Sequence, residues 1–117
     1  MFNGNNSKVI SLVSLRYFTS VKTMLYEFQG VPLLERLVIP QSVTTFRSVS
    51  VIRSCPKLKY IVFLPTQMIA AAGGNSLLWT NDCPVYVPDD LVSSYKTAQY
   101  WNQYASRFKP LSTLVDW

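Results

Sequence analysis

The sequence predicts an α/β fold, namely a short solenoid of about four parallel strands that is closed by a C-terminal helical cap. The first observation is an apolar pattern, L-x-x-L-x-I-P-x-x-V, over Leu34–Val43. A fixed period of about 20–50 residues with one short apolar strand in each unit is typical of a solenoid. The pattern returns at a period of 22–24 residues, its apolar positions being taken by Leu12, Leu15, Tyr17, Phe18 and Val21, by Leu58, Ile61, Phe63 and Leu64, and by Val85, Val87 and Pro88.

The second observation is the segment that follows the last repeat. Leu91, Tyr95 and Ala98 share one face of a helix that is expected to begin at Asp89, its N-cap. Apolar residues keep helical spacing as far as Phe108. A solenoid leaves the apolar face of its last unit open and needs such a cap. The 117 residues are expected to form one domain, with repeats over 9–88 and a helical cap over 89–112. The alternative is a small α+β domain in which the leucine spacing is coincidental.

The individual elements follow from the repeat. Residues 1–7 are expected to form a loose or docked arm, because three asparagines and a glycine resist regular structure. The segments that return between strands differ in composition. They predict a helical turn over Val21–Phe28, an extended arm over 43–52 and a longer arm that bends at Gly73–Gly74. The four expected strands are Val9–Phe18, Leu34–Pro40, Leu58–Leu64 and Val85–Val87.

The composition argues against a nucleic-acid or membrane protein. The net charge is +5, but the basic residues are dispersed along the chain, whereas nucleic-acid binders usually concentrate them on one face. The pI of about 9.4 and the aromatic content keep a basic nucleic-acid-binding protein as an alternative. No run of about 18 apolar residues is present, so no membrane insertion is expected. No signal peptide is recognisable, so we expect a protein of a virion or of the bacterial cytoplasm.

The chain offers no pattern typical of a catalytic, cofactor or metal site. Histidine, the commonest general base and metal ligand, is absent. Adjacent carboxylates at Asp89 and Asp90 are explained by a helix start. The cysteines, Cys55 and Cys83, lack a C-x-x-C partner for zinc and are expected to be buried free thiols, although a disulfide between them remains open. We therefore expect no enzyme and no small-molecule substrate.

Two stretches resemble a known family. Leu37–Val43 (LVIPQSV) and Cys55–Phe63 (CPKLKYIVF) resemble BspA-type leucine-rich repeats. The segment Cys83–Val92 (CPVYVPDDLV) is similar to the start of the module that ends many such arrays, which continues here in Tyr95-Lys96, Trp101, Tyr104-Ala105 and Lys109–Ser112. The resemblance implies a non-enzymatic binding protein of the kind found on gut bacteria and in the bacteriophages that infect them. The small size and the missing signal peptide favour a bacteriophage virion or accessory component over a bacterial surface adhesin.

The binding surface is predicted from strand alternation. If Leu37 and Ile39 point inward, Arg36 and Val38 point outward. The two outward columns are then Ser14, Arg36, Tyr60 and Pro84, and Arg16, Val38, Val62 and Tyr86. We expect another protein, a virion or cell-surface component, to bind this face; the alternative is that a terminal arm of the chain covers it. The predicted partner-binding residues are Arg16, Arg36, Val38, Tyr60, Val62 and Tyr86.

Overall fold

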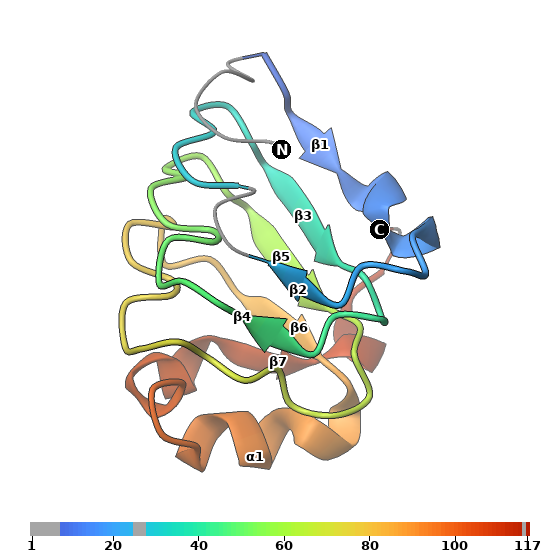
Figure 1. Cartoon of the computed structure of the whole chain (residues 1–117), viewed down its shortest axis with the longest axis vertical. Helices are drawn as coiled ribbons and strands as arrows, with labels where there is room; N and C mark the ends of the chain where they lie inside the picture. The colour runs from blue at the N-terminus through green and yellow to red at the C-terminus, as the bar shows by residue number, and fades with distance from the viewer. Residues whose placement is uncertain (1–7, 25–27, 116) are drawn as a thin grey trace.

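The computed structural model describes residues 8–24, 28–115 and 117 and has a mixed α/β fold in which the strands are parallel (Figure 1). Five strands form one sheet, in the order β1-β3-β5-β6-β7. A second parallel sheet pairs β2 with β4. The arm predicted at residues 1–7 lies outside the described residues. The strands are β1 (Ser11–Leu12), β2 (Thr23–Met24), β3 (Arg36–Ile39), β4 (Thr45–Phe46), β5 (Tyr60–Phe63), β6 (Val85–Val87) and β7 (Phe108–Pro110).

Helical structure is short and sits at the two ends of the fold. One 3₁₀ helix follows β1, and the other helical elements follow β6 and β7. Within the part of the chain that the structure describes, no helix has the length and apolar character needed to cross a membrane. The helical elements are η1 (Val13–Tyr17), η2 (Asp89–Leu91), α1 (Val92–Thr97), η3 (Asn102–Arg107) and η4 (Leu111–Thr113).

The central strands have the predicted register. Leu37 lies opposite Ile61, and Ile61 lies opposite Val85, so the three equivalent positions of the sequence pattern are neighbours in the sheet. All three side chains are buried. The short strand β4 also confirms that the chain over 43–52 is extended in part.

The first strand differs from the prediction. Leu12, rather than Leu15, lies opposite Leu37, and the chain after Leu12 forms η1 instead of continuing the strand. A 3₁₀ helix has about three residues per turn, so Leu12 and Leu15 still bury their side chains on one side. The same turn directs Tyr17 outward, where it is 71% exposed, although the repeat predicts an inward side chain at this position, which is equivalent to Ile39.

The predictions for the first return segment and for the cap are also wrong in part. The helical turn expected over Val21–Phe28 is replaced by the short strand β2 in its described part. The cap is not helical throughout, because Phe108 begins β7 and pairs with Val85. Asp89 is not an N-cap: it is the first residue of η2, and its carboxylate accepts a hydrogen bond from the backbone N–H of Ser112 at 3.0 Å.

An aromatic cluster fills the core between the last strands and the cap. The rings of Phe46 and Phe63 meet edge to face at 5.9 Å between centroids, and Trp101 lies 5.6 Å from Phe63. Tyr95 stacks on Phe108 at 5.1 Å. Aromatic pairs at these separations contribute about 0.5–1.5 kcal/mol each beyond the area that they bury. The cap is therefore held by rings from two sheets and two helical segments.

Two of these aromatic residues also complete the backbone hydrogen bonding of Ile69. The next residue, Ala70, exchanges hydrogen bonds with Thr44 and Phe46, so the peptide groups of Ile69 point away from β4. The N–H of Ile69 donates to the Tyr95 hydroxyl at 2.8 Å, and the indole N–H of Trp101 donates to the Ile69 carbonyl at 2.8 Å. Ile69 is 1% exposed, so water cannot replace either bond. The cap thus provides hydrogen-bond partners for the backbone N–H and C=O of Ile69, which would otherwise need a further strand.

We expect Tyr95→Phe to destabilise the fold by about 1–3 kcal/mol, because the ring remains but the buried N–H of Ile69 loses its acceptor. The midpoint of urea unfolding should fall while the m-value stays constant. Tyr100→Phe, which removes an exposed hydroxyl from the same region, should change stability by less than about 0.5 kcal/mol. Equal urea midpoints for Tyr95→Phe and the parent protein would show that the hydrogen bond between Ile69 and Tyr95 contributes nothing to stability.

Candidate protein-binding face

The candidate site is the outer face of the five-stranded sheet, which looks away from β2 and β4. Side chains alternate along a strand, so the neighbours of the buried Leu37 and Ile61 project onto this face. Parallel pairing sets Arg36 beside Tyr60, and Tyr86 beside Lys109. The sheet therefore gathers on one face residues that lie far apart in the sequence.

Tyr60 and Tyr86 form the centre of the accessible part of this face. Their ring centroids are 6.4 Å apart and their planes are inclined at 79°, an edge-to-face contact. Both side chains are half-buried. The two tyrosines were predicted in different outward columns, and the structure brings their rings together on a diagonal between adjacent strands.

Two arginines lie on the β1 side of the tyrosine pair. Burial raises the pKa of Tyr60 above its ordinary value, while the positive charges of Arg36 and Arg16 act in the opposite direction. Arg16 lies on η1 and not in a strand column, so its predicted position opposite Val38 is wrong. Its guanidinium lies 5.1 Å from the ring centroids of both Tyr17 and Trp117 and donates to the Trp117 carbonyl at 2.9 Å.

The two predicted valines are not available to a partner. Val38 and Val62 are 0% exposed, although they are not part of the inner core cluster. The helix η1 packs against β3. The chain after β7 returns across the sheet, so that Trp117 contacts Arg16 and the C-terminus lies beside η1 (Figure 1). These valines are therefore covered within the chain itself, while the arm at residues 1–7 that was the alternative cover for the face lies outside the described residues.

Sequence analysis missed Lys109 and the cleft beside it. The cleft has a volume of about 900 Å³ and adjoins Tyr86. Lys109 was assigned to a helix, but Phe108 falls one further period after Val85, which is the signal that could have identified β7. The cleft is lined by Asp82, Pro84, Tyr86, Gln103, Tyr104, Ser106, Arg107, Lys109 and Thr113.

Arg107 has a structural role at the base of this cleft. It is 8% exposed, and its guanidinium donates to the carbonyl of Cys83 at 2.7 Å, the hydroxyl of Thr80 at 2.8 Å and the carbonyl of Leu77 at 3.3 Å. These neutral acceptors belong to one loop, so Arg107 fixes the loop that leads into β6. A buried charge with its donors satisfied in this way is not free to bind a ligand.

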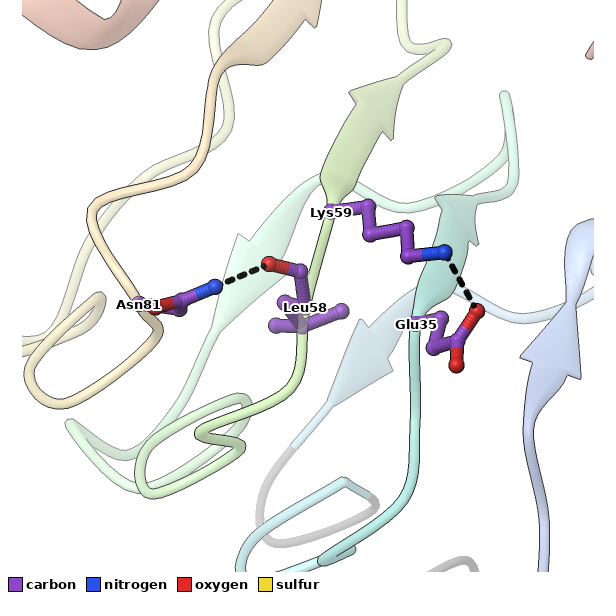
Figure 2. A network of polar contacts seen from close by, with 4 residues as sticks. All are labelled: Glu35, Leu58, Lys59 and Asn81. Atoms are coloured by element: carbon purple, nitrogen blue, oxygen red, sulfur yellow. Dashed lines mark hydrogen bonds and ion pairs between the residues drawn. The ribbon is translucent and has the colours of Figure 1, made fainter.

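The ends of the strands where the chain enters the sheet are joined by polar contacts (Figure 2). Lys59 and Glu35 form an ion pair at 3.1 Å, and the side-chain amide of Asn81 donates to the Leu58 carbonyl at 3.0 Å. Lys59 is well exposed, so the pair contributes at most about 1 kcal/mol. Among the described residues, Arg36 forms no such ion pair.

The cysteines are buried and unpaired. Burial raises the pKa of Cys55 to about 11, and its thiol donates to the Phe28 carbonyl at 2.9 Å. Burial also raises the pKa of Cys83, against the opposing charge of Arg107. Thiols that stay protonated are poor nucleophiles and poor metal ligands. Within the described residues, no three His, Cys, Asp or Glu groups come together in a way that could hold a metal ion.

Comparisons of the chain with protein-family models, with curated proteins and with solved structures found no match.

We expect the stability of the protein to fall in alkali because of two buried groups. Burial raises the pKa of Tyr95 to about 12 and that of Cys55 to about 11, from ordinary values of 10.0 and 9.0. Both groups hold their protons more tightly when folded, so their contribution is complete below about pH 9 and disappears as the pH approaches 12. For Cys55 the loss amounts to about 2–3 kcal/mol, since one pKa unit corresponds to about 1.4 kcal/mol.

Urea midpoints between pH 7 and pH 11 measure this loss. In Cys55→Ala the decline between about pH 9 and pH 11 should be smaller than in the parent protein. Identical pH profiles for the two proteins would contradict the assignment of this decline to the thiol.

Proposed function

We propose that the chain is a capped leucine-rich-repeat solenoid that acts as a non-enzymatic protein-binding module. Hydrogen bonds that join equivalent segments of successive units support the solenoid. The N–H of Glu35 donates to Ile10 and that of Lys59 donates to Glu35, both at 2.7 Å. On the opposite side, Thr44 donates to Lys22 at 2.8 Å and Ala70 donates to Thr44 at 3.0 Å. Stacked units of this kind contact only their neighbours and need a closing element.

The observation that carries the binding role is the tyrosine pair on the outer face. Tyr60 and Tyr86 are in contact and half-buried, and Tyr60 lies beside Arg36. Tyrosine and arginine are enriched at the centres of protein–protein interfaces, where they contribute most of the binding energy. Because no carboxylate pairs with Arg36 in the described part of the chain, the face combines apolar area with free positive charge.

The setting of this role is proposed from the sequence resemblance to BspA-type repeats. We propose a bacteriophage virion or accessory component, and a bacterial surface adhesin is the alternative. In either case the partner is another protein, which is consistent with a face built from half-buried aromatic residues. A basic nucleic-acid-binding protein would differ in its salt dependence, because each neutralised phosphate releases counterions.

The binding role is tested with Tyr60→Ala and Tyr86→Ala, using a partner identified by cross-linking to assembled virions or source cells. Each change should weaken binding by more than about 1 kcal/mol, because a buried aromatic anchor is lost from the interface. Thermal melting of the two variants should change much less than in Leu37→Ala, whose buried side chain costs about 2–5 kcal/mol when truncated.

Met68→Ala provides the matched surface control, because Met68 is exposed on the segment between β5 and β6. Its affinity for the partner should equal that of the parent protein. The proposal is wrong if both tyrosine variants lose stability while the folded fraction keeps full affinity. Binding to duplex DNA that weakens steeply with salt would favour the nucleic-acid alternative.

A further inference from the structure

We propose that the outer face binds an extended acidic polypeptide segment that runs across the strands, an inference that rests on the protein-binding role proposed above. The residues concerned form what we call the basic–aromatic band: Arg16, Arg36, Tyr60, Tyr86 and Lys109. Four of them come from neighbouring strands, in the order β3, β5, β6 and β7. The band therefore has cations at both ends and the two tyrosines between them.

Two positive charges of the band, those of Arg36 and Lys109, have no ion-pair partner within the described residues. The ion pair of this region joins Lys59 to Glu35 instead. Arg16 is already engaged, because it donates to the main-chain oxygen of Trp117 and to the Tyr17 hydroxyl. At the other end, Asp82 lines the same cleft as Lys109 without forming an ion pair with it. A partner that supplies carboxylates would complete these contacts.

The spacing of the band fits a short extended chain. Strands in a sheet are about 4.8 Å apart, and Lys109 is offset from Arg36 by two residues along the strand direction, so three strand intervals place the two residues about 16 Å apart. An extended chain advances about 3.3 Å per residue, so about four or five residues span this distance. Acidic residues at the two ends of such a segment would reach Arg36 and Lys109, while the residues between them lie on Tyr60 and Tyr86.

A polypeptide fits the band better than a nucleic acid does. Duplex DNA carries one charge per about 1.7 Å, so about nine phosphates would lie along about 16 Å, where the band offers only Arg36 and Lys109. The tyrosine planes are inclined at 79°, so the pair does not present two parallel faces on which successive bases could stack. Two other exposed cations lie off the band: Arg47 follows β4 in the second sheet, and Lys96 lies on α1.

The test measures the binding of poly-L-glutamate of about 20 residues by fluorescence anisotropy at low salt. Arg36→Gln and Lys109→Gln should each weaken binding by at least about fivefold, because each removes one end of the band. Lys96→Gln and Arg47→Gln lower the net charge by the same amount at exposed positions outside the band and should weaken binding by less than about twofold. Arg36→Lys should retain more affinity than Arg36→Gln, and thermal melts verify that each variant is folded.

Two outcomes would overturn the inference. If all four charge-removing variants weaken binding equally, the attraction is due to net charge and not to the band. If a 20-nucleotide poly-dT oligonucleotide binds more tightly than poly-L-glutamate and shows the same dependence on Arg36 and Lys109, the band is a nucleic-acid site. In either case, the proposed protein-binding function would still hold if Tyr60→Ala and Tyr86→Ala weaken partner binding. If these two variants bind the partner as tightly as the parent protein does, the proposed function is wrong as well.

Discussion

The fold depends on satisfying the backbone polar groups at the last open edge of the parallel strands. Parallel strands exchange hydrogen bonds with a neighbour on each side, so the final unit of a stack always leaves one row of N–H and C=O groups without a strand partner. At Ile69 this row is completed by the hydroxyl of Tyr95 and the indole N–H of Trp101. Each of these side chains combines a large apolar ring with one polar atom, so the same residue excludes water and supplies the missing hydrogen bond. The cap is thus rich in aromatic residues because it must both exclude water from this edge and supply the missing hydrogen bonds.

The sequence pattern predicts the middle of the fold and fails at its ends. Leu37, Ile61 and Val85 are neighbours because an apolar period in the sequence becomes a column in a parallel sheet. The prediction fails at Leu15, because three-residue spacing is compatible with a 3₁₀ turn as well as with the strand pattern. It fails again at Phe108, where helical spacing in the cap conceals one more strand of the same period. A local apolar pattern distinguishes a strand from a helical turn only where the segment has a neighbouring strand on both sides.

The candidate site is likewise predicted only in part from the sequence. Strand alternation identifies Arg36, Tyr60 and Tyr86 as outward-facing, and the structure brings them together. It cannot reveal that Val38 and Val62 are buried, because alternation gives the side of the sheet on which a side chain lies and not what packs over it. Burial of these valines leaves the aromatic and charged residues as the accessible part of the face. The surface that remains is more polar, and more restricted in the partners that it can accept, than alternation alone suggests.

The contact between Arg16 and Trp117 has a consequence for how the protein comes apart. In a stack of units that touch only their neighbours, the terminal units can fray independently while the middle remains folded. Here a guanidinium on η1 is held by the carbonyl and the ring of Trp117, which follows the final strand at the far edge of the sheet. Opening either edge of the sheet therefore breaks a contact with the other edge. We expect this tie to couple the two edges, so that they open together rather than one after the other.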